Sequence, residues 1–356
     1  MTTAVTRVAT RAWVMLGVGV AAQAATTVFV STPAFLIPLL HTERGLSLAQ
    51  AGVLAAAPTF GMVLTLIAWG ALADRVGERW VIAGGLALTA LAGRATLDLR
   101  VNTVMTTRDA VLAALPEAEA TPHAPDGIRL PTGTNVESLP LFNEGAIEVQ
   151  DEGSQIVGLA MQAKPGERIV DLCAGAGGKT LALAATMQNK GTILACDTDR
   201  MRLSRLAPRA TRAGVSIVET ALLNPTRETD ALADWQGRAD GVLVDAPCSG
   251  TGTWRRNPEA RWRLTPDRVS RLQSTQQHVL GVAASLVRPG GALVYIVCSL
   301  LDAEGTDQVS WFMGAHPGWT LETLDLPAGA KHGHGIRLEP GRDGTDGFFV
   351  ARLIAP

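Results

Sequence analysis

The sequence lacks three features that would narrow its chemistry at once: closely spaced cysteines, a net positive charge and an internal repeat. It has four cysteines and no C-x-x-C pair, which argues against a zinc site and a disulfide framework and fits a reducing compartment. Its six histidines are scattered apart from His332 and His334, so we predict no metal site. The formal net charge of -2 excludes a strongly basic protein. Any contact with a polyanion must therefore come from a local basic patch.

Charged residues are almost missing from the first quarter of the chain. Segments 12–40 and 45–73 contain no charged side chain, and each is longer than the roughly 20 residues that span a bilayer. A third apolar run, 80–93, would extend only roughly 21 Å as a helix that rises 1.5 Å per residue. We therefore predict two to three hydrophobic, transmembrane-like helices within residues 1–93 and membrane association through residues 12–73.

Two alternatives exist for this apolar part. One is a secretory signal peptide with a small-residue cleavage site at Ala22–Ala24, and the other is a buried helical hairpin of a soluble protein. Both are less favoured, because the first apolar run continues to Leu40 and a second run of similar length follows.

A polar turn after the second apolar segment carries a specific pattern. The run from Gly70 to Arg79, Gly-Ala-Leu-Ala-Asp-Arg-Val-Gly-Glu-Arg, resembles the loop between the second and third helices of major facilitator superfamily transporters. The resemblance covers about residues 10–93 and implies a fragment of a twelve-helix fold. Such transporters build their sites between repeats, so two helices are not expected to transport. Basic residues place both ends of the helix pair in the cytoplasm; they are Arg7, Arg11, Arg75 and Arg79.

The character of the chain changes at Arg94, where charged residues return. We predict a strand over Leu97–Thr103, a helix over Thr107–Leu115 and a loop with hairpin turns over Pro116–Gly133. After an amphipathic helix over Ser154–Ala163, apolar strands alternate with helices, which indicates a parallel sheet covered on both faces. The chain therefore divides into 1–93, a small α+β part over 94–150, and a Rossmann-like α/β part over 151–356.

A glycine-rich turn follows the first strand of the α/β part. The predicted strand Arg168–Leu172 runs into Cys173-Ala-Gly-Ala-Gly-Gly-Lys-Thr180, and a helix follows over 181–187. Glycines at such a turn let the backbone approach a ligand, and the helix N-terminus offers free N–H groups. The next predicted strand, Thr192–Asp197, ends in a carboxylate, which in doubly wound folds accepts hydrogen bonds from ribose hydroxyls.

Three ligands compete for this turn. A triphosphate loop requires glycine five residues before Gly178, where Cys173 stands. A dinucleotide site requires G-x-G-x-x-G, which the residues from Gly175 to Lys179 match poorly. S-adenosylmethionine has a ribose but no phosphate, so it fits best.

Two later strands lead into cysteines. The strand 241–245 ends at Asp245 and is followed by Cys248, and the strand 291–297 is followed by Cys298. Ligands bind beyond the carboxyl ends of parallel strands, so two thiols and a carboxylate are expected beside a methyl donor. C5 of cytosine becomes nucleophilic only after a group adds at C6, and a thiolate is suited to that addition. A positioned carboxyl group can stabilise the charge at N3. The alternative is two small core cysteines, which their places after strand ends disfavour.

Residues 94–356 resemble the Sun, or RsmB-like, family of RNA cytosine-5 methyltransferases. The resemblance rests on the glycine-rich turn, Asp245-Ala-Pro-Cys248-Ser, Tyr295-Ile-Val-Cys298-Ser, and the segments 97–103, 149–154 and 344–352. It implies that Cys298 is the nucleophile, that Cys248 assists product release and that Asp245 contacts the base. It also implies the residues that hold S-adenosylmethionine: Cys173, Ala174, Gly175, Ala176, Gly177, Gly178, Lys179, Asp197 and Asp245.

The same resemblance makes 94–150 a truncated RNA-binding subdomain and 151–356 a methyltransferase catalytic domain. Four departures qualify it. The turn has Ala-Gly-Ala-Gly-Gly for Ala-Ala-Pro-Gly-Gly, and Val297 replaces a usual threonine. An acid that contacts the cofactor after the third strand is absent, which leaves Asn224 to substitute for it. The start of the RNA-binding module is replaced by the transporter-like sequence.

A basic and aromatic cluster follows Cys248. We predict that Arg255 and Arg256 contact RNA, because they lie nearest that cysteine; further arginines and tryptophans at 254–263 suit backbone contact and base stacking. The alternative is a solvated helix start with core tryptophans. The predicted function is methylation of C5 of cytosine in RNA, with ribosomal RNA favoured, by a cytoplasmic catalytic domain anchored through the N-terminal helices.

Three rival functions remain. In the first, the chain is a transporter fragment with an inactive passenger domain. In the second, it is a gene fusion whose enzyme is weakly active, and in the third it is a DNA cytosine methyltransferase. The last is less favoured, because those enzymes act through the Pro-Cys cysteine alone and have no need of Cys298.

Overall fold

The computed structural model describes residue 47 and residues 95–356. The chain divides into two compact units between Ala90 and Leu91, and every described residue from Ala95 onward belongs to the second unit. The predicted hydrophobic helices of 1–93 and the predicted membrane association through 12–73 lie, apart from residue 47, outside the described residues. Within the described part, no helix is both long and apolar enough to cross a bilayer.

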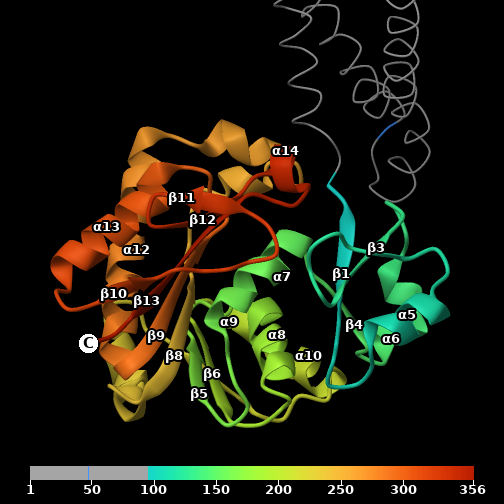
Figure 1. Cartoon of the computed structure of the whole chain (residues 1–356), viewed down its shortest axis with the longest axis horizontal. Helices are drawn as coiled ribbons and strands as arrows, with labels where there is room; N and C mark the ends of the chain where they lie inside the picture. The colour runs from blue at the N-terminus through green and yellow to red at the C-terminus, as the bar shows by residue number, and fades with distance from the viewer. Residues whose placement is uncertain (1–46, 48–94) are drawn as a thin grey trace, which may run out of the picture. The chain divides into compact units, whose positions relative to one another are not determined.

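The first described subdomain is a four-stranded antiparallel sheet in the order β2-β3-β1-β4 (Figure 1). Its core is a small apolar cluster that includes Leu99, Val111 and Ile128, each at most 1% exposed. The elements are β1 (Leu97–Val101), α5 (Arg108–Ala114), β2 (Glu119–Ala120), β3 (Gly127–Leu130), α6 (Pro140–Asn143) and β4 (Ile147–Val149).

The expected loop over Pro116–Gly133 is wrong in part, because it contains β2 and β3. Ile128 and Leu130 are buried from this segment, and β3 pairs with β1 through Leu99 opposite Ile128. Pairing with the buried strand β1 therefore makes part of this segment a strand, although its frequent Pro and Gly residues suggest a loop. The predicted strand over Leu97–Thr103 and helix over Thr107–Leu115 are confirmed within two residues at each end.

The larger sheet has parallel strands in the order β9-β8-β5-β6-β7, extended on the β9 side by antiparallel β13, β12 and β11, while β10 pairs with β13. The strands are β5 (Arg168–Asp171), β6 (Thr192–Asp197), β7 (Val218–Leu222), β8 (Ala239–Asp245), β9 (Val287–Val297), β10 (Thr320–Glu322), β11 (Ala330–His332), β12 (Gly335–Leu338) and β13 (Phe348–Ile354). Strand β6 has the bounds that the sequence predicted. Strand β9 starts at Val287, four residues earlier than predicted, and the register of its pairing with β8 shifts just after that residue.

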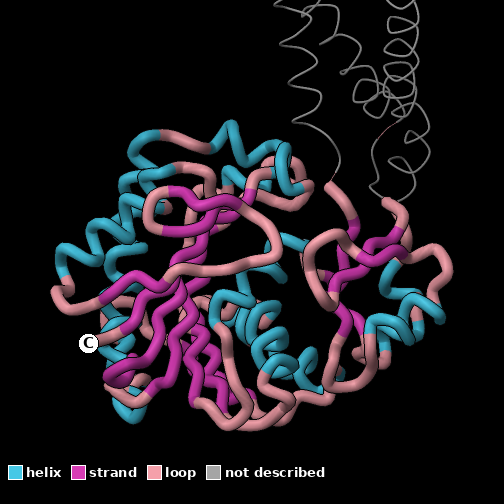
Figure 2. The backbone as a smooth tube through the Cα atoms, viewed as in Figure 1, coloured by secondary structure: helices cyan, strands magenta, loops and turns pink. Residues whose placement is uncertain are grey.

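Helices cover both faces of this sheet (Figure 2). Alternate strand residues face opposite sides: Ile169 packs into one apolar cluster with α7, α8 and α10, and Val170 into another with α12 and α13. This arrangement is the predicted Rossmann-like sandwich. The helices are α7 (Glu152–Gly158), α8 (Gly178–Thr186), α9 (Arg200–Leu203), α10 (Leu206–Arg212), α11 (Glu228–Ala231), α12 (Pro266–Leu286), α13 (Thr306–Ala315) and α14 (Pro340–Asp343).

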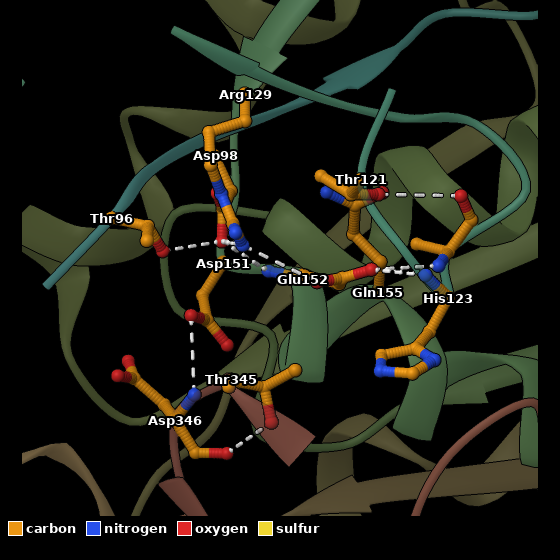
Figure 3. Close-up of polar contacts among 12 residues, drawn as sticks. Thr96, Asp98, Thr121, His123, Arg129, Asp151, Glu152, Gln155, Thr345 and Asp346 are labelled. Atoms are coloured by element: carbon orange, nitrogen blue, oxygen red, sulfur yellow. Dashed lines mark hydrogen bonds and ion pairs between the residues drawn. The ribbon is translucent and has the colours of Figure 1, made fainter. Parts of the chain in front are cut away.

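A buried carboxylate joins the small subdomain to the first helix of the sandwich (Figure 3). Glu152, which is 0% exposed at the start of α7, accepts hydrogen bonds from the backbone N–H groups of His123 at 2.6 Å and Ala124 at 2.9 Å. Arg129 on β3 lies 2.6 Å from Asp98 on β1 and 3.3 Å from Glu152. Both carboxylates are therefore paired, as buried charges require.

Candidate active site

The chain order of the sheet reverses between β5 and β8, which lie side by side and parallel. Loops that leave such strands diverge to opposite faces, so a crevice opens at their carboxyl ends. A cavity of about 660 Å³ lies there, within the size range of small-molecule sites. Residues at or just after the carboxyl ends of β5, β6, β8 and β9 line it, including Cys173, Asp197, Asp245, Cys248 and Cys298.

The glycine-rich turn after β5 is shaped by two left-handed residues. Gly175 and Gly177 have φ of 56° and 85°, and a Cβ on Gly177 would lie 2.1 Å from a methyl carbon of Leu206. A larger residue would have to displace the buried Leu206 side chain and adopt a left-handed backbone conformation that favours glycine. The Gly175 N–H donates to Asp197 at 2.8 Å, so the turn is fixed against the carboxylate at the end of β6.

Lys179 leaves this turn and points to the next strand. Its Nζ lies 2.7 Å from Asp245 and 3.2 Å from the Ser154 hydroxyl. Burial by itself would lower the pKa of Lys179, but the charge and hydrogen bond of Asp245 outweigh it and raise that pKa. Lys179 is thus a buried cation paired with Asp245. Neither it nor the residues from Ala174 to Gly178 are among those that line the cavity.

The two thiols after β8 and β9 meet in the cavity. Cys248 Sγ and Cys298 Sγ are 3.3 Å apart. The hydrogen bond to Cys298, together with burial, raises the pKa of Cys248 well above its ordinary value. The two thiols are therefore close enough to share a hydrogen bond, in which either sulfur can be the donor.

The other two cysteines differ from this pair. Cys196 is 0% exposed within β6 and is a core residue. Cys173 lines the cavity, but burial and the nearby Asp171 raise its pKa well above the ordinary value. Because the thiolate is the reactive form, neither is suited to be the nucleophile.

Known proteins place this arrangement in a family. A family model described as "16S rRNA methyltransferase RsmB/F" matches residues 158–354, more than half of the chain. The chain belongs to this family. A second model, for the major facilitator superfamily, matches residues 17–105. The two predicted resemblances are confirmed, and the transporter-like match runs past residue 93 and through β1.

Curated relatives of this RsmB/F-family chain are ribosomal RNA small subunit methyltransferases B. The chain is 36% identical over 271 residues to a probable one from Synechocystis and 36% identical over 269 residues to one from Klebsiella pneumoniae, with 72% and 73% of this chain aligned. It spans 60% of the length of each.

Solved structures agree on the fold. A methyltransferase homologue from Pyrococcus horikoshii is 27% identical, with a TM-score of 0.67 over 83% of this chain and 99% of its own. NSun6 from the same organism, 20% identical, has a TM-score of 0.68 over 80% and 97%. The Rossmann-like methyltransferase fold is thereby confirmed.

The predicted cofactor, S-adenosylmethionine, is confirmed by membership of this methyltransferase family, and the cavity fits it. Asp197, the carboxylate predicted to accept from a ribose, lines this cavity, and Leu223, Val279 and Val282 give it an apolar wall. This composition suits an adenosine better than a phosphate group, for which the cavity has only Arg202 as a cationic lining residue.

A carboxylate lies four residues beyond Asn224, the residue predicted to stand in for the missing acid after the third strand. Asn224 is exposed and is not a lining residue. Glu228, at the start of α11, lines the cavity; its Oε1 lies 3.0 Å from the Thr226 N–H and 3.0 Å from His278 Nε2. Thr226 adopts φ of 68°, which is strained for a β-branched residue. Sequence reasoning missed Glu228, because it belongs to no motif.

The two arginines predicted to contact RNA are held in ion pairs in this RsmB/F-family structure. Arg256 lies 2.7 Å from Asp151, donates to the Thr96 carbonyl at 3.1 Å and pairs with Asp346. Arg255 also pairs with Asp346 and lies 3.2 Å from Asp151. Their guanidinium groups thus tie the segment after Cys248 to the start of α7; contact with RNA stays a prediction.

Proposed function

We propose that this chain transfers a methyl group from S-adenosylmethionine to C5 of a cytosine in RNA, and that small-subunit ribosomal RNA is its substrate. One observation carries the proposal: the paired thiols of Cys248 and Cys298 share a single cavity with Asp197, the expected ribose acceptor. A base and a methyl donor bound there would be in contact. The names of the curated relatives support the RNA class.

Cys298 is the proposed nucleophile. Its sulfur adds to C6 of the cytosine, which makes C5 electron-rich. The bound cofactor supplies an electrophilic methyl group to C5. Asp245, held by Lys179 at 2.7 Å, accepts a hydrogen bond from the exocyclic amine of the base and a second one from N3, which takes up a proton as negative charge develops there during the addition. Cys298 is suited to this role because it lines the cavity and its sulfur lies 3.3 Å from that of Cys248, the second thiol that the reaction uses.

Cys248 then loses its own proton to solvent and, as a thiolate, removes the C5 proton; the electron pair released expels the Cys298 sulfur from C6. Before addition, the hydrogen bond to Cys298 is the largest cause of the raised pKa of Cys248. That hydrogen bond weakens once the Cys298 sulfur is bonded to carbon. The adduct itself therefore lowers the pKa of Cys248 and prepares it to act as a base.

The proposed cofactor contacts come from Cys173, Asp197 and Asp245, which line the cavity. Contact with the backbone of the turn from Ala174 to Lys179, which does not line it, stays a prediction. Residues 94–150 are the proposed RNA-binding subdomain and 151–356 the catalytic domain. Arg255 and Arg256 shape the rim beside Cys248. Additional contact with single-stranded RNA is assigned to Trp262, because an exposed aromatic residue can stack on a base. Trp262 is 78% exposed, and the Arg261 guanidinium lies 4.8 Å from the centre of its ring.

Covalent trapping tests the proposal. The full chain is incubated with small-subunit ribosomal RNA and S-adenosylmethionine, and denaturation-resistant protein–RNA adducts are counted for the wild type, Cys248→Ala and Cys298→Ala. We expect Cys248→Ala to accumulate adduct, because it cannot release the product, and Cys298→Ala to form none.

The remaining outcomes discriminate the alternatives. Adduct in Cys298→Ala but not in Cys248→Ala would assign the Pro-Cys cysteine as nucleophile, as in DNA cytosine methyltransferases. No adduct from any variant, despite measurable binding of the cofactor, would favour a transporter fragment with an inactive passenger domain, the rival that the match over residues 17–105 supports.

A further inference from the structure

A buried carboxylate outside the cavity connects the loops of both cysteines. Glu304 ends the short 3-10 helix Asp302–Glu304 and is 0% exposed. Its Oε1 accepts from the Ser249 N–H at 2.9 Å and from Gln276 Nε2 at 3.2 Å. Its Oε2 accepts from the Ser299 hydroxyl at 2.6 Å and from the Ser249 hydroxyl. Four donors from three segments thus converge on one side chain, and buried polar groups in such networks hold a unique geometry.

The donors stand next to the reactive residues in the sequence. Ser249 directly follows Cys248, and Ser299 directly follows Cys298. Because both serine hydroxyls donate to the same carboxylate oxygen, the backbones that carry the two thiols are fixed to one common point. Two further contacts close the arrangement: the Gly252 N–H donates to the Cys298 carbonyl at 3.0 Å, and the Leu300 N–H donates to the Thr251 hydroxyl at 2.8 Å.

Helix α12 is tied to the same point. Gln276 is 0% exposed, and its Nε2 donates both to Glu304 and to the carbonyl of Pro247, at 2.9 Å. The residue before Cys248 is therefore fixed as well as the residue after it. The Tyr295 hydroxyl donates to the Glu304 carbonyl at 2.7 Å, which anchors the backbone of Glu304 to β9.

We propose that Glu304 is a positioning residue that spans the two cysteine loops and sets the separation of the thiols. It does not line the cavity, so it acts through Ser249 and Ser299 and touches neither base nor cofactor. The part that concerns methylation rests on the proposed function; the part that concerns the thiol separation does not. Glutamate is required for its length, because an aspartate is one methylene shorter and cannot reach both loops.

Oxidative crosslinking of the two thiols measures this geometry without RNA. Diamide takes two electrons and two protons from Cys248 and Cys298 and joins their sulfurs, while its own nitrogen–nitrogen double bond is reduced. The rate depends on how often the sulfurs approach in bonding geometry. We expect rapid crosslinking in the wild-type chain and a rate about tenfold or more lower in Glu304→Gln and in Glu304→Asp. Cys173→Ser and Cys196→Ser in every sample remove the other thiols.

The control is Glu152→Gln, which changes an equally buried carboxylate at the subdomain junction. It is expected to lower the free energy of unfolding, as Glu304→Gln does, yet to crosslink at the wild-type rate. Ser299→Ala removes one hydroxyl donor and is expected to slow crosslinking by a smaller factor; it carries the test if Glu304→Gln does not fold. Wild-type rates in folded Glu304→Gln, or equal slowing in Glu152→Gln, would overturn the proposal.

Methylation provides the second measurement. A displacement of about 1 Å in a catalytic group lowers a rate by about 100-fold, so kcat of Glu304→Gln is expected to fall by 10- to 100-fold with KM for RNA unchanged. A wild-type kcat in a variant that crosslinks slowly would show that the thiol separation does not limit the reaction. If the wild type does not methylate RNA but the crosslinking rates differ as expected, the proposed function fails and the positioning role stands.

Discussion

Asp171 makes the stability of the catalytic domain depend on pH in a direction opposite to that of a paired carboxylate. It ends β5 with 0% exposure. Its Oδ2 accepts from the Thr180 hydroxyl at 2.7 Å, and its Oδ1 has no hydrogen-bond partner within the described residues. Burial is the largest cause that raises the pKa of Asp171 from 3.8 to about 7. The folded protein therefore keeps this proton to near neutrality.

The sign follows from proton binding. Between about pH 4, where an aspartate of the unfolded chain ionises, and pH 7, the unfolded state has released the proton and the folded state has not. The unfolded state then binds fewer protons, so the free energy of unfolding falls as pH rises. One pKa unit corresponds to about 1.4 kcal/mol. Asp171 thus removes about 2.5 kcal/mol of stability between pH 5 and pH 7.5, and about 4 kcal/mol over its full range.

Asp171→Asn removes this titration. Urea unfolding of the full chain, followed by far-UV circular dichroism from pH 5 to pH 7.5, is expected to show the variant gaining about 2.5 kcal/mol relative to the wild type as pH rises. The amide has its own unpaired donor, so the absolute stabilities are less informative than their difference in slope. Asp230→Asn, which removes an exposed carboxylate, is the control for the loss of one acidic side chain at the surface. A curve for Asp171→Asn that runs parallel to that of the wild type would refute the reasoning.

Two further predictions concern the ends of the cavity and the RNA surface. Glu228→Ala is expected to raise the Kd for S-adenosylmethionine about tenfold, as loss of one charged hydrogen bond does, whereas Asn224→Ala is expected to change that Kd by no more than about twofold. Isothermal titration calorimetry measures both affinities, and equal effects of the two substitutions would contradict the assignment of Glu228. Trp262→Ala is expected to weaken RNA binding by about 5- to 100-fold, since stacking contributes about 1–3 kcal/mol per base, without changing cofactor affinity. Filter binding checks this, with Trp311→Ala, on α13, as the control; an equal loss there would argue against a specific surface.

Local sequence patterns correctly predicted the strands whose bounds are set by neighbouring residues in the chain. β6 has the predicted bounds, Thr192–Asp197, because an uninterrupted apolar run ends in an acid between two turns. The same logic placed Asp245, Cys248 and Cys298 at one edge of the sheet, since parallel strands deliver their carboxyl ends together. The cavity that these residues share follows from topology alone.

Side-chain partners distant in sequence could not be predicted in this way. Lys179 pairs with Asp245, 66 residues away, although its place in the glycine-rich turn suggested a ligand contact. Arg255 pairs with Asp346, 91 residues away, so an arginine that looks free for RNA in the sequence is engaged in the fold. Glu304 carries no motif, and only the approach of two loops around it indicates a role.

The pairing of β13 with β9 sets the time at which the site can form during synthesis. Val297, the residue before Cys298, lies opposite Phe349, and the Gly347 N–H donates to the Gly252 carbonyl at 2.9 Å. Until residues 347–354 have been made, β9 therefore has one unpaired edge and the loop after Cys248 lacks this support. Domains fold as units as they emerge from the ribosome. Cys298 would then be made about 50 residues, and Cys248 about 100 residues, before the strand that completes their surroundings. At about 5–20 residues per second, these intervals are several seconds of synthesis or more.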